Sequence, residues 1–166
     1  MIKHVLISAA LLVGLAPMAV AQLSPADKAF VMKAAKSNNY EIQAAKLAQT
    51  MSHNSAYQNF AQMIITDHTQ AGQALAQAVS AADPSMQLPT TVSAGEQSKL
   101  DTLKNAGGQF DVKYRAQMIS THEAGLALVK NYLQHQHDNP GIRKVAQEMK
   151  PVFEKHWDYA KKLPKQ

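Results

Sequence analysis

Four titratable side chains stand among apolar residues on stretches with helical spacing: Glu41, His68, His122 and His156. In MIITDHTQAG at residues 63–72, for example, His68 recurs at helical spacing with Ile64 and Ile65. A charge in a protein interior must be paired or must coordinate a metal. Imidazole is a good ligand for zinc, copper and iron, and a carboxylate adds compensating charge. The pattern predicts that these residues hold one transition metal ion, which is copper, iron or zinc.

A metal-free network is the alternative interpretation of the same residues. An inward histidine is often an ordinary core residue, and Glu41 could satisfy the histidines by hydrogen bonds alone. The stretch HQHD at residues 135–138 also contains potential ligands, but its composition favours a polar turn.

Four neighbouring residues are candidates for orienting the ligands: Asp67, Asp111, Tyr114 and Met118. Asp67 is either a hydrogen-bond partner that fixes the imidazole of His68 or a surface acid. Asp111 shares a helix face with His122, about three turns away. Tyr114 is either a hydrogen-bond donor to the site or a core aromatic residue. Met118 is either a ligand suited to copper or core filler.

Helix signals divide the chain into four long helices and one short one. Ser24 and Pro25 begin the first helix, which is expected to reach Met51, and SHNS separates it from a second helix that stops before ADPS. A long connection over 83–108 contains a capping box of Ser93 with Glu96 and the short amphipathic helix EQSKLDTLKNA. The last two helices are expected over 109–135 and 140–162. The prediction is an all-α, four-helix bundle with a long crossover that contains a short helix.

The spacing of the four ligands from the turns places them at one height. Each lies about 12 to 18 residues from the nearer hairpin turn, which is roughly 18 to 27 Å along a helix. Glu41, His68, His122 and His156 are therefore expected to converge halfway along the bundle.

The N-terminal stretch has the pattern of a secretory signal peptide. Lys3 precedes an apolar run that ends in Ala19-Val20-Ala21, which predicts cleavage after Ala21 and one domain over 22–166. No other segment is apolar enough to span a bilayer. We expect a periplasmic or secreted protein. The absence of cysteine excludes disulfides, thiolate ligands and a cysteine-linked lipid anchor.

Charge and motifs limit the function classes. The chain has a net charge of +5, but its lysines are scattered, which argues against a nucleic-acid surface. It has no nucleophile elbow, Gly-rich phosphate loop, H-E-x-x-H or CxxC motif. No catalytic residue is predicted, and a binding protein is favoured over an enzyme.

Four segments resemble the successive motifs of a secreted bacterial family: NNYEIQAAKLAQ, FAQMIITDHTQA, FDVKYRAQMISTHEAGLAL and MKPVFEKHWDYA. The family is the domain of unknown function numbered four-one-four-two, often labelled a putative outer membrane protein and grouped with ferritin-like folds. The resemblance covers about residues 25–161. It implies a ferritin-like bundle whose recurrent polar positions include the four ligands, Asp67, Asp111 and Tyr114, and it implies no activity.

The sequence departs from the ferritin-type di-iron signature. That signature needs a Glu-x-x-His pair on each of two helices, whereas Ile65 and Ile119 stand three residues before His68 and His122. A single ion with mixed carboxylate and imidazole ligands fits better. We expect metal storage, sequestration or stress handling. The alternatives are a metal-free structural or interaction module of the envelope, with an envelope protein as partner, and, ranked last, a metal-dependent redox enzyme. An exposed apolar strip from Leu100 to Leu103 would favour the interaction module.

Overall fold

The computed structural model describes residues 22–134 and 139–165, and this part of the chain contains helices and no strand. The elements are α1 (Pro25–Met51), α2 (Ser55–Ala82), α3 (Ala94–Lys104), the 3-10 helix η1 (Gly107–Gln109), α4 (Phe110–Leu133) and α5 (Pro140–Lys162). The predicted all-α class is confirmed. The helix predicted over 109–135 is α4. It begins one residue late because η1 supplies the turn that enters it, and it ends at Leu133.

The helices begin at side chains that satisfy their free N–H groups. The hydroxyl of Ser24 accepts from the backbone of Asp27, whose carboxylate accepts from the backbone of Ser24 in return. Ser93 and Glu96 form the same capping box at α3, as predicted. Asn54 and Asn139 cap α2 and α5.

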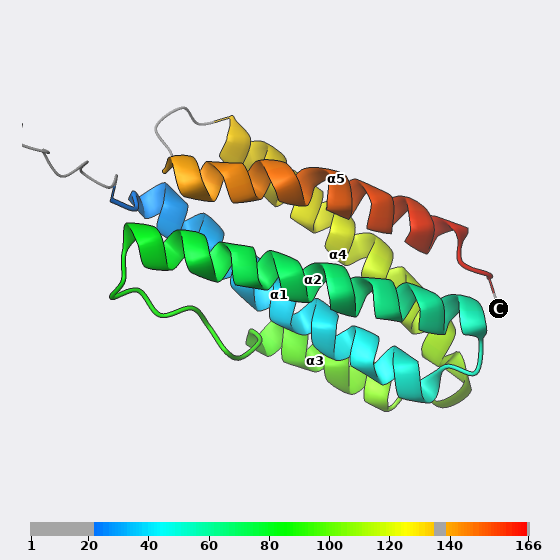
Figure 1. Ribbon diagram of the computed structural model, residues 1–166. Helices are drawn as coiled ribbons and strands as arrows, with labels where there is room; N and C mark the ends of the chain where they lie inside the picture. The colour runs from blue at the N-terminus through cyan, green and yellow to red at the C-terminus, as the bar shows by residue number, and fades with distance from the viewer. Residues whose placement is uncertain (1–21, 135–138, 166) are drawn as a thin grey trace, which may run out of the picture.

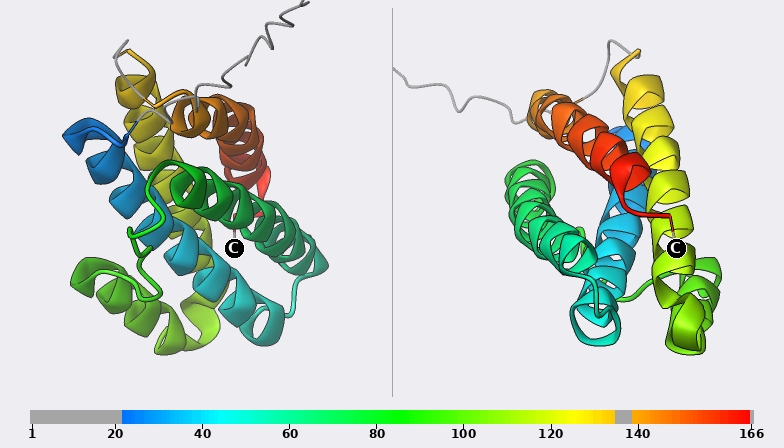
Figure 2. Two further views of the ribbon diagram at one scale, coloured as in Figure 1. Left: turned by 60° about the vertical axis from the view of Figure 1, so that its left-hand side comes forward. Right: turned by 90° about the vertical axis from the view of Figure 1, so that its right-hand side faces the viewer.

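The four long helices lie side by side. α1 packs against α2 and α4, and α5 packs against α4 and α2, so that each long helix has two long neighbours (Figure 1). α2 and α4 run in the same direction, so the chain between them travels back along the molecule (Figure 1). α3 lies in this connection and covers the outer side of α1 and α4 (Figure 2). Leu100 is 1% exposed and Leu103 is 0% exposed, so the apolar strip that would favour an interaction module is buried.

The interior consists of two apolar clusters separated by a polar layer. One cluster lies toward the α1–α2 turn and contains Phe60, Tyr114 and Met118. The other lies toward the opposite end and contains Phe30 and Phe153. Each long helix contributes residues to both clusters and one buried titratable residue to the polar layer between them. These residues are Glu41, His68, His122 and His156.

Two predictions concern residues outside the described part. The signal peptide over 1–21 and the HQHD turn over 135–138 both lie there. Within the described helices, none combines the length and apolar character that crossing a membrane requires.

Candidate metal centre

The polar layer brings one carboxylate and three imidazoles together, one from each long helix. Glu41 is 2% exposed, and His68, His122 and His156 are at most 1% exposed. One ring nitrogen from each histidine lies within 4.8 Å of the others. The Oε2 atom of Glu41 lies 3.3 Å from Nε2 of His68 and 3.1 Å from Nε2 of His122. The four side chains meet as their heights along the helices predict.

In His122 and in His156, one ring nitrogen donates a hydrogen bond to an oxygen that can only accept. Nδ1 of His122 donates to the backbone carbonyl of Met118 at 2.8 Å. Nε2 of His156 donates to Oδ2 of Asp67 at 2.9 Å. These bonds fix the neutral tautomers, with the proton on Nδ1 of His122 and on Nε2 of His156. The remaining nitrogen of each ring therefore carries a lone pair.

His68 is held by an amide. Its Nδ1 lies 3.1 Å from Oδ1 of Asn38, which stands three residues before Glu41 on α1. With the amide oxygen as acceptor, Nδ1 donates and Nε2 presents its lone pair toward Glu41.

Burial sets the protonation of the histidines. It disfavours the imidazolium ion and lowers the pKa of His68, His122 and His156 to about 4. All three imidazoles are therefore neutral at pH 7, and neutral imidazole is the form that binds a metal.

Glu41 divides its carboxylate between a protein partner and the centre. The hydroxyl of Ser37 donates to Oε1 at 3.0 Å, and Oε2 faces the imidazoles. Burial raises the pKa of Glu41, while His68 and the bond from Ser37 oppose that rise. A cation at Oε2 would stabilise the ionised carboxylate in this buried position.

Four atoms of the centre have no hydrogen-bond partner within the described residues: Oε2 of Glu41, Nε2 of His68, Nε2 of His122 and Nδ1 of His156. With the tautomers above, the three nitrogens are acceptors, and so is Oε2 when Glu41 is ionised; acceptors about 3 Å apart repel unless a proton or cation lies between them. Zinc ligands sit about 2.0–2.1 Å from the ion, so two ligands of a tetrahedral ion are roughly 3.3 Å apart. The separations between Glu41 and the two nearer imidazoles, 3.3 and 3.1 Å, match that spacing.

An aromatic ring closes the centre on one side. Phe153 of α5 stacks on His68 at a centroid distance of 5.7 Å and meets the edge of His122 at 5.8 Å. A Cβ atom at Gly125 would lie 3.1 Å from the Phe153 ring, and one at Gly72 would lie 2.9 Å from Nδ2 of Asn38. The two glycines leave room for the side chains that support the imidazoles.

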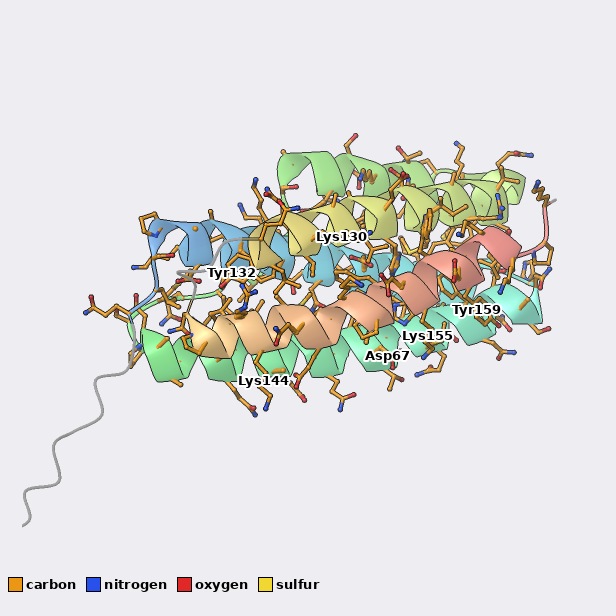
Figure 3. The ribbon with its side chains drawn as sticks, turned by 90° about the horizontal axis from the view of Figure 1, so that it is seen from above. Asp67, Lys130, Tyr132, Lys144, Lys155 and Tyr159 are labelled. Carbon is orange, nitrogen blue, oxygen red and sulfur yellow. The ribbon has the colours of Figure 1, made fainter. Side chains whose placement is uncertain are left out.

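Two of the predicted orienting residues lie at the centre: Asp67 orients a different imidazole from the one expected, and Met118 is core filler, one of its two predicted alternatives. Asp67 bonds to His156 of α5 and not to His68, and it also contacts Lys155 at 3.2 Å (Figure 3). The reason is that successive residues of a helix point about 100° apart. Burial raises the pKa of Asp67, but the hydrogen bonds from His156 and Lys155 outweigh burial and leave this pKa below its usual value. Met118 contributes its carbonyl, while its side chain is core filler.

The other two predicted orienting residues do not reach the centre. Asp111 shares the face of His122 but lies about 16 Å away along α4, where it lines a cavity with His53 near the α1–α2 turn. Tyr114 packs against Phe60 and Phe110, and its hydroxyl has no hydrogen-bond partner within the described residues. Distance along α4 therefore separates Asp111 from the centre, whereas Tyr114 is a core aromatic residue, one of its two predicted alternatives. Burial and the charge of Glu41 raise the pKa of Tyr114.

Sequence reasoning missed three residues that support the centre: Ser37, Asn38 and Phe153. Ser37 and Asn38 precede Glu41 by four and three residues, the helical spacing at which side chains are neighbours. That spacing was a usable signal. No comparable signal marks Phe153 among the other apolar residues of α5.

Comparison with known proteins identifies a family without a known function. Residues 14–163 match the family described as a domain of unknown function, DUF4142. No curated protein and no solved structure matches the chain. The match spans nearly all of the sequence, including every residue of the candidate metal centre, so the chain belongs to the DUF4142 family.

Proposed function

We propose that this protein is an exported metal-binding protein with a ferritin-like four-helix bundle. Glu41, His68, His122 and His156 hold one transition metal ion, and the protein serves in metal storage, sequestration or stress handling. The observation that carries the proposal is the set of four converging, buried acceptor atoms without a hydrogen-bond partner within the described residues. The signal-like N-terminus supports export.

The chemistry of the ligand set limits the ion. Three neutral imidazoles and a carboxylate suit zinc, copper or iron, and they are poor ligands for magnesium or calcium, which prefer oxygen. The outer bonds from His122 to Met118 and from His156 to Asp67 fix the ring orientation. Such bonds raise the affinity of a histidine site.

Metal content tests the proposal. The protein is exported to its own compartment, purified without a polyhistidine tag and analysed by elemental mass spectrometry. We expect about one ion per chain and almost none in the His68→Ala/His122→Ala variant. His53→Ala is the control, because His53 is exposed and outside the centre. Absence of metal from both the wild type and the double variant, with the variant less stable, would show that the layer is a structural network.

A further inference from the structure

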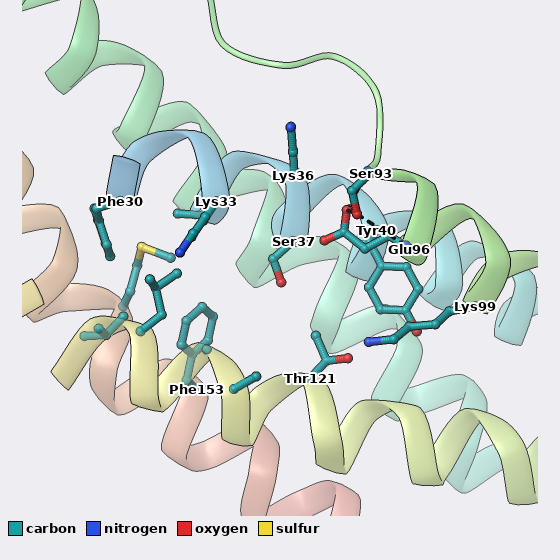
Figure 4. A pocket seen from close by; sticks show the side chains of 16 residues that line it. Phe30, Lys33, Lys36, Ser37, Tyr40, Ser93, Glu96, Lys99, Thr121 and Phe153 are labelled. Carbon is teal, nitrogen blue, oxygen red and sulfur yellow. Dashed lines mark hydrogen bonds between the residues drawn. The ribbon is translucent and has the colours of Figure 1, made fainter. Parts of the chain in front are cut away.

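A second cavity lies next to the candidate metal centre, between α1, α3, α4 and α5 (Figure 4). Its volume is about 520 Å³, within the range of pockets that hold small molecules. Phe153 forms part of its wall, and the same ring packs on His68 and His122. One aromatic ring therefore contacts both the cavity and the metal centre.

One end of the cavity is apolar. Phe30 and Phe153 line it (Figure 4). Aliphatic and thioether side chains from α4 and α5 also line the cavity: Leu128, Val129 and Met149. This end can hold an apolar group and exclude water from it.

The rim of the cavity is positively charged. Lys33, Lys36 and Lys99 line it, and none of them has an ion pair with a carboxylate within the described residues. Glu96 is the one acidic residue in the lining, and its Oε2 already accepts from the backbone and hydroxyl of Ser93. The rim therefore has cationic groups available for an anion.

Two hydroxyls add polar contacts between the rim and the apolar end. Thr121 is 6% exposed and lines the cavity; burial raises the pKa of Tyr40, and a hydrogen bond with Thr121 opposes that rise. Ser37 lines the cavity and donates to Glu41. Thr121 and Ser37 therefore make this part of the cavity wall polar.

We propose that this cavity binds a small amphipathic anion, with its carboxylate beside Lys99 at the polar end and its apolar tail against Phe30 and Phe153 (Figure 4). Lys33 and Lys36, at other points of the rim, add to the positive charge that attracts the anion. The inference goes beyond metal binding and does not require it, since no metal ligand takes part in the contact.

Binding of decanoate to metal-free protein, measured by calorimetry below its micelle concentration, tests this site. We expect one molecule per chain and an affinity about tenfold lower for Lys33→Gln/Lys36→Gln/Lys99→Gln. The matched control removes three exposed lysines outside the cavity, Lys46→Gln/Lys113→Gln/Lys130→Gln, with the same change in net charge. Its affinity should equal that of the wild type. Equal affinities of the two triple variants would overturn the proposal.

Two further arms separate this site from other modes of binding. Ala124 lines the cavity from an exposed position, so Ala124→Trp should block decanoate, whereas Ala116→Trp, exposed on the same helix outside the cavity, should not. Decyltrimethylammonium should bind much more weakly, and equal binding would contradict the cationic rim. Binding to phosphatidylglycerol vesicles without binding of dissolved decanoate would indicate a lipid surface and overturn the small-molecule ligand.

Discussion

Each histidine of the centre is oriented by a different kind of acceptor. His122 donates to a carbonyl of its own helix, His156 to a carboxylate on α2, and His68 to an amide on α1. The carbonyl is fixed by the helix backbone, whereas the amide of Asn38 stands on a side chain that can rotate. The contact between His68 and Asn38 is therefore the one that a small change in packing can disturb most easily.

Gly72→Ala should weaken metal binding through Asn38. The added Cβ would lie 2.9 Å from Nδ2 of Asn38, so the amide must move and its contact with His68 is disturbed. Loss of such an outer bond lowers metal affinity by about 10- to 100-fold. Alanine also favours the helix by about 0.5–1 kcal/mol relative to glycine, so the folding stability should change little. Competition of zinc with a chromophoric chelator measures the affinity, and thermal unfolding measures the stability.

Gly95→Ala is the matched control for this substitution. Gly95 is also helical, but a Cβ at that position meets no atom within 4 Å. Its variant should bind zinc as tightly as the wild type. Equal zinc affinities for the two glycine variants would show that Asn38 does not support His68.

At the scale of the elements, α1 and α3 begin with the same capping box, but the carboxylates of the two boxes differ in the further hydrogen bonds that they accept. Within the part of the chain that the structure describes, the carboxylate of Glu96 in α3 accepts hydrogen bonds from Ser93 alone. Asp27 of α1 is 0% exposed and accepts in addition from the hydroxyl of Tyr132 and from the backbone of Asn139 at 3.0 Å. Asp27 therefore ties the start of α1 to the end of α4 and the start of α5.

Asp27→Ala should destabilise the fold much more than Glu96→Ala. The first variant loses a cap and two further buried hydrogen bonds, those from Tyr132 and Asn139, which together cost about 2–4 kcal/mol. The second loses a cap alone, which costs about 1 kcal/mol. The free energy of unfolding from urea titrations of both variants measures the difference. Equal losses would mean that the bonds to Tyr132 and Asn139 contribute nothing to stability.

The element boundaries were predictable because local chemistry sets them. Ser24 with Pro25, Ser93 with Glu96, and Asn139 with Pro140 begin helices at the positions expected from capping preferences. The height of the four ligands was also predictable, because helical rise is constant. The sequence did not reveal the apolar contacts that bury Leu100 and Leu103, since those depend on where α3 packs.

The partners of the ligands were harder to predict because they depend on how the helices rotate against one another. Asp67 precedes His68 in the chain, yet it faces α5 and bonds to His156. Asp111 lies on the same face of α4 as His122 but about three turns away along the helix, and residues that far apart do not touch. Asn38 was within reach of sequence reasoning, because it stands one turn before Glu41.

At the scale of the whole molecule, the polar layer divides one interior into two apolar clusters. Burying unpaired acceptors costs stability unless something satisfies them. An apolar replacement of similar volume would fill the layer at no such cost. The layer therefore lowers the stability of the metal-free protein, and a bound ion would stabilise the folded state by an amount that grows with the logarithm of its free concentration divided by its Kd.

The metal-free protein should lose stability as pH falls from about 6.5 to about 4. Burial lowers the folded-state pKa of His68, His122 and His156 to about 4, whereas unfolded histidine titrates near 6.5. Between these values the unfolded chain binds more protons, so acid favours unfolding. The raised pKa of Glu41 acts in the opposite direction, so the net uptake of protons on unfolding is smaller than three.

Urea unfolding at a series of pH values measures how steeply the free energy of unfolding depends on pH. His156→Gln, which cannot titrate, should reduce that slope by about one proton. A slope equal to the wild type in His156→Gln would contradict a neutral, buried imidazole at that position.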